Sequence, residues 1–420
     1  MLFVSDGNSG FNHVLFQTTA FRRLFMPLNH DRSPLQVFLV FLRLGLTSFG
    51  GPVAHLGYFR DEFVCRRGWL SERSYADLVT LCQFLPGPAS SQVGIALGLA
   101  RAGYPGALAA WLGFTMPSAL ALMLFALGIA SFGEAIPAGI LQGLKVVAVA
   151  IVAQAVWGMA RNLCPDAPRI SLMAVAACLV LLVPSAWAQV GVIVVAGIVG
   201  LFMFKPVQTL EHDPLSISIS HRAGVCWLTL FFVLLLGLPL LAELWPSQTL
   251  NMLDAFYRTG SLVFGGGHVI LPLLQAEVVP SGWVSNETFL AGYGATQAMP
   301  GPLFTFAAFL GASMHGPQSG WLGGVLGLIA IFVPSFLLVF AALPFWEQLR
   351  RNVRMQAAML GINAAVVGLL LAALYRPVWT SAILQPMDFA LALVALVALM
   401  AWKLPPWLVV IGCGAAGWLL

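Results

Sequence analysis

Charge is what this chain most lacks. Charged residues make up 9% of its 420 residues, against about 25% in a typical soluble domain. A net charge of +4 provides no electrostatic footprint for nucleic acid, and the composition excludes a disordered chain and a typical cytosolic enzyme. No phosphate-binding loop occurs, and the longest polar connections, 58–74 and 205–222, leave no room for a nucleotide-binding domain.

Cysteine pairs and enzyme signatures are missing as well. The six cysteines form no Cys-x-x-Cys pair, and none has a histidine at zinc-ligand spacing, so neither a metal site nor a disulfide framework is indicated. No nucleophile-elbow, zinc-protease or paired-acid pattern is present. We therefore expect no catalytic residue, cofactor or metal, and the N-terminal residues lack the pattern of a signal peptide.

Apolar sequence is abundant instead, since 60% of the residues are hydrophobic. A membrane-spanning helix needs about 20 mostly apolar residues. Thirteen apolar segments occur, at about 35–57, 75–100, 104–130, 138–160, 170–186, 188–204, 223–245, 251–275, 288–314, 319–343, 355–375, 388–402 and 405–420. This pattern predicts an all-α polytopic membrane protein.

The chain also repeats itself at an offset of 214 to 218 residues. The matching pairs are Arg43–Pro52 with Arg258–Gly267, Gly68–Ser71 with Gly282–Ser285, Gln83–Pro88 with Gln297–Pro302, Pro117-Ser118 with Pro334-Ser335, and Gly143–Lys145 with Gly361–Asn363. Five pairs in one order indicate duplication. The predicted organisation is a cytoplasmic tail over 1–34, a repeat over 35–204, a linker with a lone helix over 205–250, and a second repeat over 251–420.

An odd number of segments separates the two repeats, so the second is predicted to be inverted relative to the first, as in many secondary transporters. Arg and Lys favour cytoplasmic loops. Loops and tails carry 17 of the Arg and Lys residues. If all thirteen segments cross the membrane, 12 of these 17 lie on the cytoplasmic side. If the first two segments of each repeat are re-entrant hairpins, 16 lie on the cytoplasmic side, with Arg376 the exception. We therefore prefer nine full spans and four hairpins, with the N-terminus and 58–74 cytoplasmic and 276–287 outside.

Each hairpin has a local cause, because Gly and Pro interrupt these segments. Ordinary kinked helices are the alternative. The predicted breaks are Gly50-Gly51-Pro52, Pro86-Gly87-Pro88, Gly265-Gly266-Gly267 and Pro300-Gly301-Pro302. Inside a membrane such breaks persist only where protein or a water-filled cavity satisfies the backbone.

A break leaves a helix N-terminus with unpaired N–H groups at membrane depth, which is a ready anion site. Ser90 and Ser91 follow the first Pro-Gly-Pro, and Thr305 follows the second, so their hydroxyls add donors. Gln83 and Gln297 stand three residues before each motif. Together these side chains are predicted to contact an anionic substrate.

Arg43 and Arg258 precede a glycine break by about two turns. No acid in the sequence is buried deeply enough to be an obvious partner for both, and an unpaired intramembrane arginine suits a dianionic oxyanion. The alternative is that they extend to the interface or bind carbonyls. Lys145, whose repeat partner is Asn363, is a weaker substrate contact by the same reasoning.

Four further residues lie near the breaks and can titrate. His55 and His268 follow the glycines and could carry a proton, although a structural hydrogen bond is the more common role. Glu62 and Glu277 are repeat equivalents near the hairpin exits, where a gating or interface role fits.

These motifs resemble the chromate ion transporter family of bacteria. The resemblance lies in Phe49-Gly50-Gly51-Pro52 with His55, Gly68-Trp69-Leu70-Ser71, Pro86-Gly87-Pro88, Phe264-Gly265-Gly266-Gly267-His268 and Pro300-Gly301-Pro302, and it covers about 35–420 as in the family's long, two-domain members. It implies a protein of the inner (plasma) membrane that exports chromate, confers chromate resistance, is driven by membrane potential or a proton gradient, and meets sulfate as a competing analogue.

Alternatives stay open at this point: a sulfate or other oxyanion permease, or an anion channel. The expected partners are chromate and the lipid bilayer, with a homodimer left open and neither nucleic acid nor nucleotide expected.

Overall fold

The computed structural model describes residues 33–132, 137–205, 219–316 and 318–419, and every regular element within those ranges is a helix. The predicted all-α class is therefore confirmed. Nearly all of the expected tail over 1–34 lies outside the described residues. Several helices begin at a Ser or Asp whose side chain accepts a backbone N–H three residues on, among them the repeat-equivalent caps Ser71 and Ser285.

Helices in the first repeat are short around the Gly and Pro motifs and long elsewhere. They are α2 (Pro34–Thr47), α3 (Gly51–Arg60), the π-helix η2 (Asp61–Arg66), α4 (Glu72–Phe84), α5 (Ala89–Phe132), α6 (Ala138–Leu163), α7 (Ala167–Leu182) and α8 (Ala186–Met203). α5 comprises two helices, because Ala102 and Gly103 leave the helical conformation. Its two arms pack closely across that turn: a Cβ on Gly98 would lie 2.3 Å from the carbonyl oxygen of Gly106.

α9 (His221–Leu244) stands between the repeats. The second repeat contains α10 (Gln248–Leu262), η4 (Gly267–Val269), α11 (Ile270–Val278), α12 (Asn286–Thr296), η5 (Leu303–Thr305), α13 (Phe306–Ser313), α14 (Gly320–Ala342), η6 (Leu343–Phe345), α15 (Trp346–Arg351), α16 (Val353–Ala373), η7 (Leu374–Trp379), α17 (Thr380–Ala382), α18 (Pro386–Met400) and α19 (Pro406–Leu419). The order of long and short helices in it parallels that of the first repeat.

All four predicted breaks are present. α2 ends at Thr47 before α3 begins at Gly51, α4 ends at Phe84 before α5, and α10 and α12 end before η4 and η5. Six of the seven glycines at these breaks adopt positive φ, for example 123° at Gly87 and 100° at Gly301. An L-residue rarely adopts such a backbone conformation, which is why glycine is needed there.

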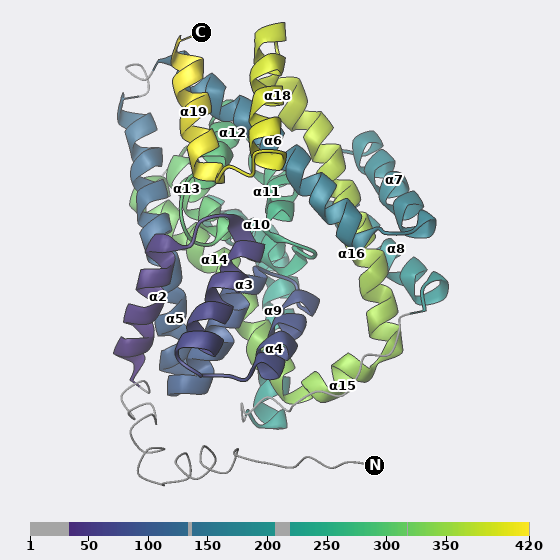
Figure 1. Cartoon of the computed structure of the whole chain (residues 1–420). Coiled ribbons are helices and arrows are strands. Elements are labelled where there is room, and N and C mark those ends of the chain that lie inside the picture. The colour runs from purple at the N-terminus through teal and green to yellow at the C-terminus, as the bar shows by residue number, and fades with distance from the viewer. Residues whose placement is uncertain (1–32, 133–136, 206–218, 317, 420) are drawn as a thin grey trace, which may run out of the picture.

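Apart from α5, whose first arm ends at the turn of Ala102 and Gly103, the helices on either side of each break are too short to cross a bilayer. α2 has 14 residues and α12 has 11, whereas about 20 are needed. Figure 1 shows α3 and α4 in the lower half of the molecule, and α12 and α13 in the upper half. These two pairs of short helices thus lie in opposite halves of the molecule. The re-entrant topology itself stays a prediction.

Within the described ranges, six helices are long and apolar enough to cross a membrane: Ala89–Ser131, Gly139–Leu163, Ala186–Met203, His221–Leu244, Gly320–Phe345 and Val353–Ala382. Three of the nine predicted spans fall short, because α7, α18 and α19 have only 16, 15 and 14 residues. At 1.5 Å per residue, such helices measure about 21–24 Å, less than the roughly 30 Å hydrocarbon core.

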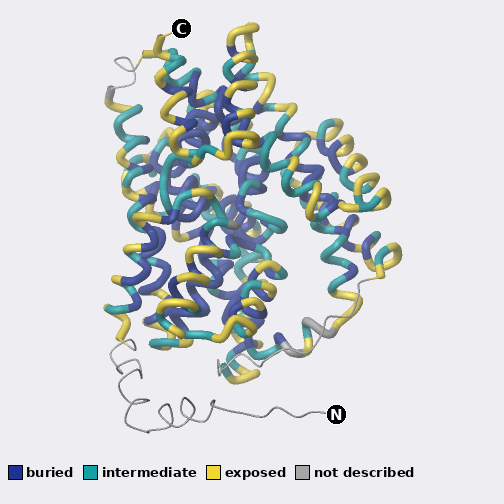
Figure 2. The backbone as a smooth tube through the Cα atoms, in the orientation of Figure 1, coloured by how far each residue is buried: buried dark blue, intermediate teal, exposed yellow. Residues whose placement is uncertain are grey.

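Apolar side chains cover much of the outer surface. α9 buries only Gly224 and Phe231, while its Leu236 is 64% exposed. Figure 2 shows buried residues gathered in the middle and exposed ones along the outer helices. An apolar exterior of this extent is stable only against lipid, so the chain is a multi-pass membrane protein.

Candidate functional site

The two Pro-Gly-Pro motifs dock onto the opposite repeat. The Gly87 N–H donates to the carbonyl oxygen of Val263 at 2.7 Å, and the Gly301 N–H donates to that of Ser48 at 2.9 Å. Gly87 and Gly301 are repeat equivalents, and so are Ser48 and Val263, which directly follow α2 and α10. The repeats therefore exchange equivalent contacts, and all four breaks meet at one place.

A second exchanged contact lies beside the first. A Cβ on Gly87 would lie 2.7 Å from Ser335 Oγ, and a Cβ on Gly301 would lie 2.8 Å from Ser118 Oγ. Ser118 in α5 and Ser335 in α14 are again repeat equivalents. Each Pro-Gly-Pro turn thus packs against the Pro-Ser of the other repeat, with no room for a side chain at its glycine.

His55 holds the first repeat's break together. Its ring is 1% exposed, with Nε2 3.2 Å from the Ser48 carbonyl oxygen and Nδ1 3.4 Å from Ser90 Oγ. A neutral imidazole satisfies both contacts by donating from Nε2 and accepting at Nδ1. His55 therefore fixes the residue that also accepts the Gly301 N–H.

His268 takes a different position in the second repeat. Its Nδ1 lies 2.8 Å from the hydroxyl of Tyr293, and its ring lines a chamber of about 60 Å³ where the breaks converge. We call this space the central chamber. Its wall also includes Gly50, Gly51, Gln154, Gln297 and Gly301.

The central chamber adjoins a larger cavity of about 550 Å³, which we call the lateral cavity. The two spaces share Gly50, Gln154, His268 and Pro406 as lining residues. Among the described residues that line either space there is no carboxylate, and the lateral cavity carries one lysine, Lys403. The combined space is thus positive and lined with polar donors.

Lys403 lies on the turn between α18 and α19, residues 401–405. Figure 1 shows this turn within the height of the molecule and not at either end. α19 packs tightly on α6, since a Cβ on Gly143 would lie 2.1 Å from the Cys413 carbonyl oxygen. This packing brings the turn to Gln154 of α6 and Gly50 at the break.

Helix N-termini add to the positive character of the chamber. α3 begins at Gly51, which lines it, and the first N–H groups of a helix have no partner within that helix. Gln297 at the end of α12 also lines the chamber, and its Nε2 is buried without a hydrogen-bond partner. A small oxyanion would satisfy such donors.

Comparison with known proteins identifies the family. The sequence profile described as chromate transporter matches residues 35–201 and 250–418. The chain belongs to the chromate transporter family. Because the two matched stretches correspond to the two repeats, this is a long family member with both.

Several known proteins align over most of the chain. A chromate transport protein of Pseudomonas aeruginosa is 28% identical, with 92% of each chain covered. A probable chromate transport protein of Synechococcus elongatus is 26% identical, with 88% of this chain and 90% of the relative covered. An uncharacterised transporter of Methanocaldococcus jannaschii is 29% identical, with 84% and 86% covered. No solved structure matches the chain.

Several residues predicted from the sequence converge in this family member. Gly50, Gly51, His268, Gln297 and Gly301 all line the central chamber. Four others are buried beside the breaks: Ser90, Ser91, Thr305 and His55. Thr305 already donates to the Pro302 carbonyl, whereas Ser91 Oγ has no partner among the described residues.

Other predicted contacts lie elsewhere. Arg43 and Gln83 are exposed, and Lys145 is half-buried on α6 without lining the chamber or the lateral cavity. Glu62 is buried at the base of a hairpin, where it pairs with Arg66 and Arg67. For Arg43, Gln83 and Lys145 a direct role at the anion site stays a prediction, as does a gating or interface role for Glu62.

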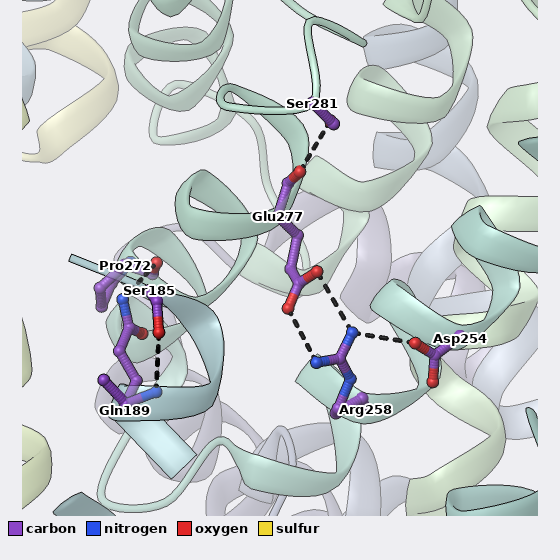
Figure 3. Close-up of polar contacts among 8 residues, drawn as sticks. Ser185, Gln189, Asp254, Arg258, Pro272, Glu277 and Ser281 are labelled. Atoms are coloured by element: carbon purple, nitrogen blue, oxygen red, sulfur yellow. Dashed lines mark hydrogen bonds and ion pairs between the residues drawn. The ribbon is translucent and has the colours of Figure 1, made fainter. Parts of the chain in front are cut away.

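The reasoning that left Arg258 without an acidic partner is wrong. Its Nη2 donates to Asp254 Oδ2 at 2.9 Å, and its Nη1 lies 3.1 Å from Glu277 Oε1 (Figure 3). Asp254 lies one helical turn before Arg258, and Glu277 comes from α11 after the break. The sequence places both acids near segment ends, but the short α10 and α11 bring those ends inward.

Sequence reasoning missed Lys403 as a site residue. In the count of Arg and Lys, Lys403 was assigned to a cytoplasmic loop. In the structure it lines the lateral cavity together with Gly50 of the first break. One signal was present in the sequence: Lys403 is one of only three lysines and separates the apolar segments 388–402 and 405–420, which at 15 and 16 residues are short for a span.

Proposed function

We propose that this protein is a secondary transporter that exports chromate from the cytoplasm and so confers chromate resistance. The substrate is the tetrahedral dianion, bound in the central chamber. The protein lies in the bacterial inner membrane with its N-terminus in the cytoplasm. Membership of a transporter family agrees with a role other than catalysis.

The observation that carries this proposal is a chamber without a carboxylate, lined by Gly50 and Gly51 of one break, Gly301 of another and His268, which directly follows a third. Positive helix ends, the unpartnered Gln297 amide and the nearby Lys403 all favour a small anion there. The relatives named as chromate transport proteins supply the identity of the anion.

The exchanged contacts suit alternating access between inverted repeats. Each Pro-Gly-Pro turn is held by the other repeat through Gly87 or Gly301. A rigid-body rotation of one repeat would strain both hydrogen bonds together, so the two Pro-Gly-Pro turns would respond as a pair. The inverted relation itself stays a prediction, supported by the opposite placement of the short helices (Figure 1).

Membrane potential alone favours export of a dianion. Moving one charge through 100 mV is worth about 2.3 kcal/mol, so two negative charges leaving a negative interior gain about 4.6 kcal/mol per 100 mV. A proton gradient can add to this.

Sulfate permeation is the main alternative, because sulfate has the same charge and shape and the chamber offers the same donors to both. An anion channel is the other, although the closed contacts between repeats favour alternating access. A homodimer is compatible with either and stays a prediction.

Labelled chromate uptake into inverted membrane vesicles tests the proposal. We expect saturable uptake that requires energised vesicles, is inhibited by sulfate, and is lost when Pro300-Gly301-Pro302 is replaced by alanines. Non-saturating flux would show a channel. Sulfate transport that outcompetes chromate at equal concentration would replace chromate as the substrate.

A further inference from the structure

The second repeat contains a buried ionic cluster outside the anion site. We call Asp254, Arg258 and Glu277 the Arg258 cluster (Figure 3). Arg258 Nη2 lies 2.9 Å from Asp254 Oδ2 and 3.2 Å from Glu277 Oε2. The exposed fraction of the side chain is only 10% for Arg258, 12% for Asp254 and 18% for Glu277. The guanidinium is also covered by the Trp187 ring, whose centroid is 4.7 Å away.

Charge does not balance within this cluster. Two carboxylates share one guanidinium, so the fully ionised cluster has a net charge of −1. Burial of an uncompensated charge is costly, and like charges around one site favour binding of a proton. A proton on one carboxylate would make the cluster neutral and leave Arg258 paired with the other.

The fold does not require this cluster, because the first repeat forms the same hairpin without it. There the equivalent of Arg258 is Arg43, which is exposed, and the equivalent of Asp254 is Leu39. The equivalent of Glu277 is Glu62, which pairs with loop arginines instead. A purely structural clamp would be expected in both repeats.

Few other ionisable groups surround the cluster. α8 and α14 carry none, η4 contributes His268, which faces Tyr293, and the described parts of α9 and α16 carry charges only toward their ends. Those end residues are His221, Arg222 and Glu243 of α9 and Arg354 of α16. Arg376 of η7 lines the cavity next to Glu277, but it is exposed and forms no ion pair with the cluster among the described residues. Neutralisation of the excess charge therefore falls mainly to the cluster itself.

The cluster also has a neighbouring cavity and an unused donor. A cavity of about 290 Å³ is lined by Gln275 and Ala276, directly before Glu277, together with Gln189 and Arg376. Arg258 Nε is buried without a hydrogen-bond partner, and the whole residue is 9% exposed. Water in this cavity would provide a path for a proton to Glu277, whose preceding residues line it.

We propose that the Arg258 cluster binds one proton that moves inward as chromate moves outward. This inference rests on the proposed export of chromate and names its coupling ion. In the ionised state Arg258 holds both carboxylates; a proton from water on the outer face then binds a Glu277 carboxylate oxygen, and Arg258 pairs with Asp254 alone. Release of the same proton to cytoplasmic water restores the ionised cluster.

The test separates chromate exchange, which moves no net proton, from uptake driven by a pH gradient. Purified protein is reconstituted into vesicles with the membrane potential clamped, as wild type, Glu277→Gln, Asp254→Asn and the control Glu72→Gln. Glu72 is a matched carboxylate paired with Arg60 on the exposed surface at 2.6 Å. Vesicles more acidic inside than outside should accumulate chromate in the wild type and in the control.

In Glu277→Gln we expect chromate exchange to persist and accumulation driven by the pH gradient to be lost. Glu277→Asp, which keeps a carboxylate, should restore part of the driven accumulation. The infrared band of a protonated carboxyl group, present in the wild type during pH titration, should disappear in Glu277→Gln.

Other outcomes overturn the inference in distinct ways. Wild-type vesicles that exchange chromate but ignore the pH gradient, or respond to a sodium gradient instead, would exclude proton coupling. Full accumulation driven by the pH gradient in Glu277→Gln would remove Glu277 as the proton site. Loss of both chromate exchange and driven accumulation in folded Glu277→Gln and Glu277→Asp would show that Glu277 acts in chromate transport itself and not in proton coupling. Wild-type vesicles without chromate exchange would refute the proposed function instead.

Discussion

Gly87 and Gly301 provide the sharpest test of the interlocked breaks. Replacement of either by alanine introduces a Cβ where φ is 123° or 100°, a conformation that costs an L-residue about 1–3 kcal/mol. The new methyl group would lie 2.7 Å from Ser335 Oγ or 2.8 Å from Ser118 Oγ, so the turn must move.

Movement of the turn also breaks the hydrogen bond to the other repeat, at 2.7 Å from Gly87 or 2.9 Å from Gly301. A hydrogen bond of this kind contributes about 0.5–1.5 kcal/mol. The two effects sum to about 1.5–4.5 kcal/mol. This is equivalent to roughly a 10- to 2,000-fold change in the equilibrium between the state in which the turn contacts the other repeat and a state in which it does not.

Both variants should therefore unfold at lower temperature in detergent and lose most chromate uptake in inverted vesicles. Gly57→Ala in α3 is the matched control, because its Cβ would meet no atom within 4 Å and its φ is ordinary. It should gain slightly in helix stability and transport normally. Normal stability and transport in both Gly87→Ala and Gly301→Ala would refute the claim that these turns are locked by the opposite repeat.

Three further predictions concern charge and topology. Arg258→Ala should lower the yield of folded protein, since it leaves two buried carboxylates unpaired at a cost of about 3–5 kcal/mol. Arg43→Ala, at an exposed position, should fold normally. Wild-type chromate affinity in purified Arg43→Ala would remove Arg43 from the predicted anion site. Lys403→Ala should weaken chromate binding by about 10- to 150-fold with unchanged monodispersity, and unchanged affinity would exclude Lys403 from the site. A cysteine at Gly68 in a cysteine-free background should be labelled only from the cytoplasm, and labelling only from outside would contradict the hairpin topology.

Composition and repetition determined much about this protein before any tertiary contact was considered. Long apolar segments with few charges require a bilayer, because only helices satisfy the backbone there. Gly and Pro at matching positions of two repeats predicted where each helix breaks, and the structure confirms all four places. These inferences were secure because they depend on local backbone chemistry.

Tertiary structure alone decided which polar groups face one another. Whether Arg258 is free or paired depends on α11 folding back beside α10, which brings Glu277 within 3.1 Å. Lys403 reaches the lateral cavity only because α18 and α19 are too short to span and pack against α6. Apolar periodicity places residues on a helix, but the depth of a turn and the pairing of charges follow from the packing of helices far apart in the sequence.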